Sequence, residues 1–159
     1  MDSVIPTILN LGAGNRISKN AINHDFRKHR PEINAVHDLN VLPWPWPDNS
    51  FVHIEAWAVL EHLEIGLIES LGECWRVLRP GGILRVKLPF WNVDQSYADP
   101  THRWFFSLRV LDIFDPDTVR GKEYSFYTDR HWRITKPAEK VSASAFYAEL
   151  TPRKDEGTS

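Results

Sequence analysis

The stretch LNLGAGNR, residues 9–16, constrains the fold more than any other part of the sequence. A short apolar run, TILNL, ends at Gly12, and a second glycine follows at Gly14. This pattern is typical of a buried strand that runs into a tight turn. Glycines at such a turn let a ligand approach the backbone closely, so we expect the segment to cradle a nucleotide-like cofactor.

Four more segments are predicted to be strands. They are AIN together with His24 and Asp25, INAVHDL at residues 33–39, FVHIEAW at residues 51–57, and ILRVKLPF at residues 83–90. The links that join the first three strands are shorter than the dozen or more residues that a full crossover helix needs. We therefore expect at most a turn or two of helix in these links, and a thinly covered edge of the sheet.

Apolar residues at helical spacing predict a long amphipathic helix between the fourth and fifth strands. Its stripe is formed by Leu60, Leu63, Leu67, Leu71, Cys74 and Leu78. The run Pro80-Gly81-Gly82 is expected to end this helix. A second helix is predicted for RWFFSLRVLDIF, residues 103–114.

The end of the chain is expected to close the sheet. HWRITK (residues 131–136) and SAFYAEL (residues 144–150) can pair as an antiparallel hairpin. The sequence thus predicts the α/β class, with an open, mostly parallel, Rossmann-like sheet, reduced helices on one edge and a C-terminal antiparallel hairpin. We expect a single domain over residues 1–150, followed by a polar, frayed tail over residues 151–159.

Composition narrows the class of protein. The net charge is −2, whereas non-specific nucleic-acid binding is driven by a strong excess of basic residues. No apolar stretch is long enough to span a membrane, and we expect no secretory signal at the start. The only cysteine is Cys74, so an intramolecular disulfide is impossible. Together these features favour a cytoplasmic protein.

Several residues fall at or just past the ends of the predicted strands. They are Gly12, Asp25, Asp38 and Trp57. In open α/β sheets, ligands bind outside the carboxyl ends of the strands, so these residues are expected to share one site. Asp25 can accept hydrogen bonds from both hydroxyls of a ribose, and Asp38 can accept one from an adenine amino group. The alternative is that both carboxylates cap helices or lie in solvated turns.

The glycine turn distinguishes poorly between cofactors by itself. The nicotinamide fingerprint requires G-x-G-x-x-G opening a helix, and Ile17 stands at the third glycine position. A nicotinamide-dependent oxidoreductase therefore remains the less favoured alternative.

Four stretches in order carry a resemblance to a known family. They are LNLGAGN, VHDLNVLPWPWPDNSF, VLEHL and ECWRVLRPGGILRVKLPF, and DPTHRWFF extends the match to about residue 106. With these motifs the chain resembles class I S-adenosylmethionine-dependent methyltransferases, in particular small methyltransferase-domain proteins with abbreviated first crossovers. The resemblance implies S-adenosylmethionine as cofactor and an unidentified methyl acceptor, a small molecule or a protein. EAWA replaces the PPY-type tetrapeptide of base N-methyltransferases, which argues against a base as acceptor.

The resemblance also implies a role for each candidate cofactor-binding residue. These residues are the methionine-side turn Gly12, Ala13, Gly14 and Asn15; the ribose acceptor Asp25 with Phe26 beside the adenine; Asp38 and Leu39 at the adenine edge and face; Ala56 and Trp57 on the floor near the sulfonium; and His62, which would close the site.

His102 is the candidate catalytic residue, on the loop after the fifth strand. An imidazole can take a proton from an acceptor hydroxyl or amine near neutral pH. The alternative is a histidine that is hydrogen-bonded to the loop backbone. Asp99, three residues earlier, can cap a following helix with Pro100 as its first residue. Among the seven histidines, His62 and His102 can approach one cleft. No H-x-E or H-E-x-x-H spacing exists, however, so no metal site is predicted.

The proline-rich segment LPWPWPDNS, residues 42–50, is predicted to be an ordered flap beside the adenine. Trp44 or Trp46 would then cover an aromatic face of the ligand, whereas the alternative packs both tryptophans on the core.

A second function remains open beside the enzyme. Val52 stands where the family usually has an aspartate, and the substrate region is short. These features favour a non-catalytic S-adenosylmethionine-binding module or partner subunit, and an oligomer is possible.

Overall fold

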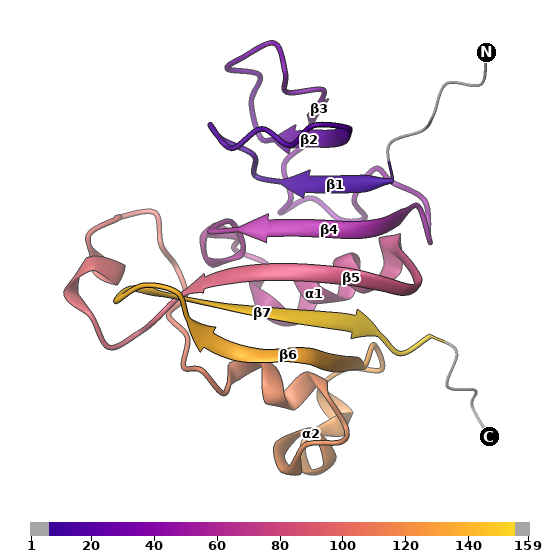
Figure 1. Cartoon of the computed structure of the whole chain (residues 1–159), viewed down its shortest axis with the longest axis vertical. Coiled ribbons are helices and arrows are strands. Elements are labelled where there is room, and N and C mark those ends of the chain that lie inside the picture. The colour runs from indigo at the N-terminus through magenta and orange to yellow at the C-terminus, as the bar shows by residue number, and fades with distance from the viewer. Residues whose placement is uncertain (1–6, 155–159) are drawn as a thin grey trace.

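The computed structural model describes residues 7–154. Within this range, one sheet contains the strands β1 (Ile8–Leu11), β2 (Ala21–Asp25), β3 (Ala35–Val36), β4 (Phe51–Trp57), β5 (Leu78–Pro89), β6 (Trp132–Lys140) and β7 (Ala145–Pro152). Their order in the sheet is β3-β2-β1-β4-β5-β7-β6. Strands β1 to β5 run parallel, whereas β7 is antiparallel to β5 and β6. The predicted open, mostly parallel sheet with a C-terminal antiparallel hairpin is confirmed (Figure 1).

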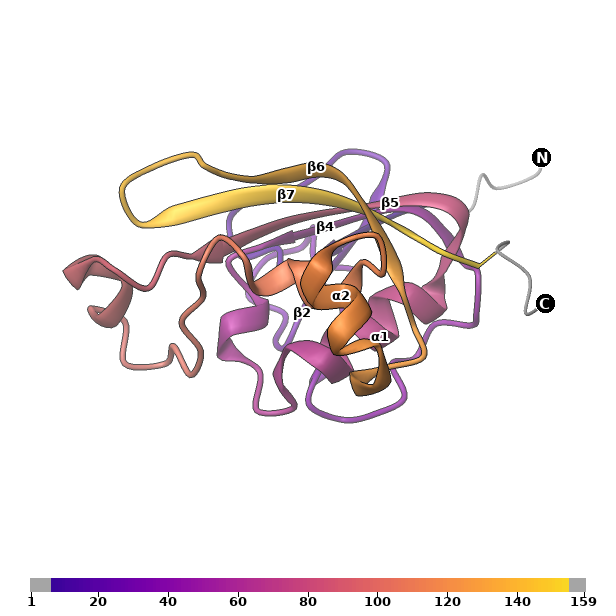
Figure 2. The same ribbon diagram turned by 90° about the horizontal axis from the view of Figure 1, so that it is seen from below.

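The core lies between one face of this sheet and the helices. Helices α1 (Gly66–Val77) and α2 (Val119–Glu123) lie on the same side of the sheet (Figure 2). Leu71 and Cys74 of α1 are fully buried in the same apolar cluster as Ile54 of β4 and Leu84 of β5. The links from β1 to β2 and from β2 to β3 contain turns and no helix, as their short lengths predict.

On the opposite face of the sheet, side chains and not helices cover the central strands. Trp57 stacks on Tyr147 with 5.4 Å between ring centroids, and the Arg16 guanidinium lies 3.7 Å from the Trp57 ring centroid. Arg85 and Glu149 form an ion pair across β5 and β7, 3.3 Å between Nε and Oε1. Parallel sheets are usually covered by helices on both faces, so this polar, aromatic cover replaces a missing layer.

The predicted long helix is divided near its start, because the intervening backbone groups have partners elsewhere. Its first leucine lies in a 3₁₀ turn, η1 (Leu60–His62), and α1 begins only at Gly66. Asn40 Oδ1 accepts a hydrogen bond from the Glu64 amide at 2.7 Å. Leu63 O accepts one from Trp104 Nε1, also at 2.7 Å. These bonds hold a turn over residues 63–66, closed by a hydrogen bond from the Gly66 amide to Leu63 O, where the leucine spacing predicts continuous helix.

The same helix ends earlier than predicted. Leu78 is extended, fully buried, and pairs with Phe51 as the first residue of β5. The run Pro80-Gly81-Gly82 therefore lies within a strand instead of ending a helix. Gly81 adopts a φ of 75°, which suits glycine at this irregular point of the ladder.

The second predicted helix, residues 103–114, is wrong. Its first residues run beside the end of β5, where Phe106 forms an isolated bridge with Phe90. Phe106 is buried, and its carbonyl accepts a hydrogen bond from the Trp91 amide at 3.0 Å. Only a 3₁₀ segment follows, η3 (Val110–Phe114). The other 3₁₀ turns in the described residues are η2 (Asp94–Tyr97) and η4 (Ser125–Tyr127).

The chain remains anchored past residue 150. Strand β7 continues to Pro152, and the nearly buried Arg153 pairs with Asp115 at 2.8 Å between Nη2 and Oδ1. Lys154 Nζ donates to Asn49 Oδ1 at 2.6 Å. Residues 151–154 of the predicted tail are thus held by defined contacts, and residues 155–159 lie outside the described range. In the described part of the chain, no helix has the length and apolarity that a membrane crossing requires.

Candidate functional site

A cavity of about 750 Å³ opens at the carboxyl ends of β1, β2 and β4. Six of the predicted cofactor-binding residues line it, namely Gly12, Asp25, Phe26, Asp38, Leu39 and His62. The topology brings them together because the parallel strands all end at this edge of the sheet. The volume lies within the range of ~300–1,000 Å³ that is usual for small-molecule sites.

Asp25 holds the glycine turn at one wall of the cavity. Its Oδ2 accepts a hydrogen bond from the Gly14 amide at 2.8 Å, and its Oδ1 accepts one from the Phe26 amide at 2.7 Å. Gly12 and Gly14 have φ values of 56° and 53°, in the left-handed region that favours glycine. Each carboxylate oxygen retains a second acceptor site, so Asp25 can still bind ligand hydroxyls.

His24 also lines the cavity, and the analysis of the sequence assigned it no role there. Its Nδ1 accepts from the Gly12 amide at 3.2 Å, which leaves the proton on Nε2, 2.8 Å from the His37 carbonyl oxygen. Burial lowers the pKa of His24. A neutral His24 of fixed tautomer therefore supports the glycine turn from the end of β2.

The far wall of the cavity combines an apolar surface with a carboxylate. Phe26 leaves 69% of its surface exposed, whereas Leu39 is buried. Asp38 Oδ1 accepts from the Asn40 amide at 2.9 Å, and this turn places the carboxylate in the lining. Asn40 itself was missed by the sequence analysis, although its position two residues after Asp38 fits a polar turn.

The other predicted cofactor-binding residues lie behind or beside the lining. Ala13 is buried, while Gly14 and Asn15 belong to the turn without lining the cavity. Ala56 is fully buried in β4, and Trp57 stacks on Tyr147 on the opposite face of the sheet. The chain turns directly after Trp57, so the cavity is lined by the residues that follow β4 and not by its last two residues.

Four further residues complete this side of the lining. They are Ala58, Val59, Leu63 and Thr101. Ala58 has a φ of 51°, which redirects the chain toward the cavity. A Cβ on Gly12 would lie 2.5 Å from Val59 Cγ2, so glycine is required where β1 and β4 meet. The signal for Val59 was its place in VLEHL, just past the predicted strand end.

The predicted flap over the adenine is wrong, and the alternative of core packing is correct. Trp44 is 2% exposed, and its Nε1 donates to Leu39 O at 2.9 Å. Trp46 packs edge-on against Phe51, with 5.8 Å between ring centroids. Neither tryptophan lines the cavity. Large aromatic rings gain most from burial in the core, and Trp44 also holds the Leu39 carbonyl from behind the cavity.

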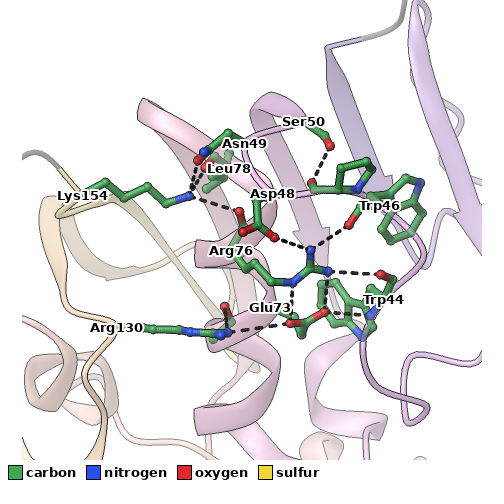
Figure 3. A network of polar contacts seen from close by, with 12 residues as sticks. Trp44, Trp46, Asp48, Asn49, Ser50, Glu73, Arg76, Leu78, Arg130 and Lys154 are labelled. Carbon is green, nitrogen blue, oxygen red and sulfur yellow. Dashed lines mark hydrogen bonds and ion pairs between the residues drawn. The ribbon is translucent and has the colours of Figure 1, made fainter.

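This proline-rich segment is held by a charged network from α1 (Figure 3). Arg76 donates to Trp44 O at 3.1 Å and to Trp46 O at 2.8 Å. Its guanidinium also bonds Glu73, whose Oε2 accepts from the Trp44 amide at 2.7 Å. Asp48 Oδ1 accepts from the same guanidinium at 2.9 Å. The segment is thus ordered, as predicted, but by its attachment to α1.

A cluster of Glu61, His62 and His102 borders the cavity through His62. Glu61 Oε1 lies 3.9 Å from His62 Nε2 and 3.8 Å from His102 Nε2. Burial raises the pKa of Glu61 to about 7 and lowers the pKa of His62. The two imidazole centroids are 4.8 Å apart. The three side chains therefore form one coupled polar group.

His102 adopts the alternative arrangement of a histidine bonded to the loop backbone. Its Nδ1 lies 2.8 Å from Ser96 O, and its side chain does not line the cavity. Asp99 caps no α-helix, because none follows within residues 100–118. Asp99 Oδ1 instead accepts from the amide and the hydroxyl of Thr101 at 2.8 and 2.6 Å. The role of His102 as a base remains a prediction.

Comparisons with known proteins place these features in a family context. Residues 12–86 match a family model described as a methyltransferase domain. No curated protein sequence matches the chain. A S-adenosylmethionine-dependent methyltransferase from Archaeoglobus fulgidus is structurally similar, with a TM-score of 0.59, 15% identity, and coverage of 91% of this chain and 85% of that one.

Two further solved structures extend the comparison. A chain from a complex that contains the Haloferax volcanii Trm112 methyltransferase activator has a TM-score of 0.56 and 15% identity, and the match covers 92% of this chain and 82% of that one. The cyclase SpnF has a TM-score of 0.62 and 14% identity, with coverage of 91% and 73%. The fold is that of class I methyltransferases, and the resemblance inferred from the motifs is confirmed.

Proposed function

We propose that this chain is a S-adenosylmethionine-dependent methyltransferase. The observation that carries the proposal is the cavity at the strand ends, which lies almost entirely within the segment that matches a methyltransferase domain. The fold alone does not decide the reaction, because the structurally similar SpnF is a cyclase.

The chemistry of the lining fits S-adenosylmethionine. Asp25 offers carboxylate oxygens to a ribose diol, and Asp38 offers one to an adenine amino group. Phe26 and Leu39 supply apolar surface for the adenine faces. The left-handed turn at Gly12 leaves backbone close to the cavity, where the methionine part would lie. The glycine turn does not match the dinucleotide-binding motif, because Ile17 occupies the position of its third glycine.

The proposed reaction is an in-line displacement. The cofactor supplies a methyl group already activated by a sulfonium. The acceptor atom donates its electron pair to the methyl carbon, the carbon–sulfur bond breaks, and that pair stays on sulfur. An acceptor that bears a proton releases it to a base or to water. The protein orients the acceptor and excludes water, so few catalytic groups are needed.

The acceptor is proposed to be a small molecule or a protein. The residues EAWA at the end of β4 argue against a nucleobase amine, since Ala56 is buried and Trp57 stacks on the far face of the sheet. A candidate acceptor side is formed by the loop that contains Thr101 and His102, because Thr101 lines the cavity.

A second candidate function is a S-adenosylmethionine-binding partner subunit. Two observations favour it. The segment after β5 contains little regular structure, and one similar structure is a complex with a methyltransferase activator. This candidate would bind the cofactor but show no methyl transfer in an acceptor screen.

Calorimetric titration with S-adenosylhomocysteine, S-adenosylmethionine and NAD tests the proposal. We expect saturable binding of the first two compounds and none of NAD. Asp25→Ala should weaken binding by at least tenfold, because each charge-assisted bond contributes ~1.5–3 kcal/mol. Asp94→Ala is the matched control, since Asp94 is exposed and lies outside the lining. Binding of NAD alone, or unchanged affinity in Asp25→Ala with the fold intact, would refute the proposed site.

A further inference from the structure

We infer that Glu61, His62 and His102 form a binding site for one divalent first-row transition-metal ion at the edge of the cavity. One ligand atom from each residue lies within 4.8 Å of the other two. The inference extends the proposed function by adding a metal centre that the histidine spacing in the sequence did not predict.

The hydrogen bonds of the two histidines fix which nitrogen each offers. His102 Nδ1 lies 2.8 Å from Ser96 O, and His62 Nδ1 lies 3.2 Å from Thr101 O. Thr101 Oγ1 also lies 2.9 Å from His62 Nδ1, and this hydroxyl donates its own proton to Asp99 Oδ1. These oxygens therefore accept from the rings, so both Nδ1 atoms carry the proton and both Nε2 atoms hold a lone pair. Metal-binding histidines are commonly oriented in this way, by a carbonyl bonded to the other ring nitrogen.

Both lone pairs face the same carboxylate. Glu61 Oε1 lies 3.8 Å from His102 Nε2 and 3.9 Å from His62 Nε2. Glu61 is 1% exposed, and its Oε2 has no hydrogen-bond partner. A second carboxylate oxygen, Asp99 Oδ2, lies 3.7 Å from His102 Nε2. Acceptor atoms that converge with no hydrogen bond between them repel one another, and this repulsion is weakly screened in a buried site. A cation between them removes this cost.

The ligand set favours a particular class of ion. Two imidazole nitrogens and one carboxylate oxygen are found around catalytic zinc and related ions, with at least one position left open. Ligand atoms of a tetrahedral zinc site lie roughly 3.3 Å apart, given bond lengths of about 2.0–2.1 Å. The observed 3.8 and 3.9 Å require each Glu61–histidine pair to close by about half an ångström. The three ligand atoms lie within 4.8 Å of one another, so the widest pair closes by up to about 1.5 Å, through side-chain rotation.

The architecture explains why sequence spacing gave no signal. Glu61 and His62 are consecutive in the 3₁₀ turn η1, whereas His102 comes from the loop after β5. The Arg103 amide donates to Glu61 O at 2.8 Å, which ties the two segments together beside the cluster. The metal-binding geometry thus depends on a backbone contact between residues 42 positions apart (103 minus 61).

Resting on the proposed function, the site also suggests the class of acceptor. His62 and Thr101 line the cavity, so an ion held by the cluster lies where an acceptor would enter. A bound cation lowers the pKa of a coordinated hydroxyl, which favours an oxygen nucleophile. The hydroxyl proton then passes to water, the oxygen pair forms the bond to the methyl carbon, and the carbon–sulfur pair remains on sulfur. We therefore expect a hydroxyl compound as acceptor.

Cobalt titration tests the site independently of activity. The full chain, without an affinity tag and stripped of metal by a chelator, is titrated with Co²⁺ while the visible d–d absorption is recorded. We expect a band that saturates at one equivalent and is removed by Zn²⁺. Glu61→Gln and His102→Gln should each weaken Co²⁺ binding at least tenfold. Glu64→Gln and His131→Gln are the matched controls, because both residues lie outside the cluster, and binding should be unchanged in them.

The outcomes separate this inference from the proposed function. The same samples are titrated with S-adenosylhomocysteine, and their fold is checked by circular dichroism. Saturable Co²⁺ binding that the cluster variants weaken supports the site, whether or not S-adenosylhomocysteine binds. A wild-type protein that binds S-adenosylhomocysteine but shows no Co²⁺ band, or variants that bind Co²⁺ like the wild type, overturns the metal site alone. If one cluster variant fails to fold, His62→Gln replaces it in the same comparison.

Discussion

Asp25 accepts hydrogen bonds from the amides of Gly14 and Phe26, so a substitution there acts on the glycine turn as well as on a ligand. His24, the preceding residue, bonds Gly12 in the same turn. Two consecutive side chains at the end of β2 therefore shape the loop that the proposed cofactor would contact. Any loss of cofactor affinity in variants of either residue must be compared with the change in the free energy of unfolding.

His24 should make the stability of the protein depend on pH. Burial lowers its pKa in the folded state, and this effect outweighs the hydrogen bond to the His37 carbonyl and the Asp25 charge, which both raise the pKa. Below pH ~6.5 the unfolded chain takes up a proton that the folded protein does not. The free energy of unfolding should therefore fall as the pH drops from 7 through 6.5 toward the lowered folded pKa. Above that window, His24 contributes no pH dependence.

Urea unfolding at pH 7 and pH 5 measures this effect. His24→Asn keeps an acceptor near the position of Nδ1 for the Gly12 amide but cannot be protonated in this range. We expect the variant to lose less unfolding free energy than the wild type between the two pH values. Equal losses in the two proteins would show that His24 is not the group responsible.

At the scale of elements, strands were predicted better than helices, and the residues show why. FVHIEAW forms β4 over the predicted residues. A strand that packs on one face alternates buried and exposed residues, and this alternation can be recognised in the sequence itself. The leucine spacing from residue 60 to residue 78 predicted too long a helix. At both ends, contacts with residues distant in the sequence hold the backbone in other conformations. Asn40 holds the linker before α1, and the ladder with Phe51 draws Leu78 into β5.

The residues of the candidate site likewise divide into those that the sequence predicts and those that it does not. Gly12, Asp25 and Asp38 were found because each lies at or just past the end of a strand, and parallel strand ends converge. The sequence indicates that His62 and His102 can approach one cleft, but not that both meet Glu61, because that contact depends on a loop conformation between residues 39 positions apart (101 minus 62). Trp57 was assigned to the cavity, but the period of β4 directs its side chain to the other face.

Arg76 is predicted to control the proline-rich segment from α1. It bonds the carbonyls of Trp44 and Trp46 and the carboxylate of Glu73, and its side chain is only 16% exposed (Figure 3). Arg76→Met should lower the free energy of unfolding by about 2–4 kcal/mol, because it removes the guanidinium that pairs with the Glu73 carboxylate and donates to two carbonyls.

Chemical unfolding followed by tryptophan fluorescence measures this change, since both indoles lie in the affected segment. Arg79→Met is the control, because Arg79 is exposed and bonds the same segment only at the Asn49 carbonyl. We expect the control to change the free energy of unfolding by less than ~1 kcal/mol. Similar losses in the two variants would mean that the buried network has no special role.

At the scale of the whole molecule, the helices α1 and α2 cover one face of the sheet, and side chains alone cover the central part of the other (Figure 2). The core is therefore a single layer between the sheet and α1, and the cavity lies at its edge. Its walls come from the carboxyl ends of β1 and β2, the turns after β3 and β4, and Thr101, and most of these segments are positioned by the sheet. A ligand in the cavity can bind fully only when the sheet itself is folded.

S-adenosylhomocysteine should consequently raise the melting temperature of the whole chain. A ligand that binds only the folded state at 100 times its dissociation constant adds ~2.7 kcal/mol. For a chain of this size, each 1 kcal/mol shifts the midpoint by about 2–4 °C, so we expect a shift of roughly 5–10 °C.

Differential scanning calorimetry should show one transition that moves as a unit. Asp25→Ala should reduce the shift, whereas Asp94→Ala should retain it. A midpoint that stays fixed at saturating ligand, despite binding detected by titration, would show that the cavity opens separately from the sheet and would contradict a single cooperative layer.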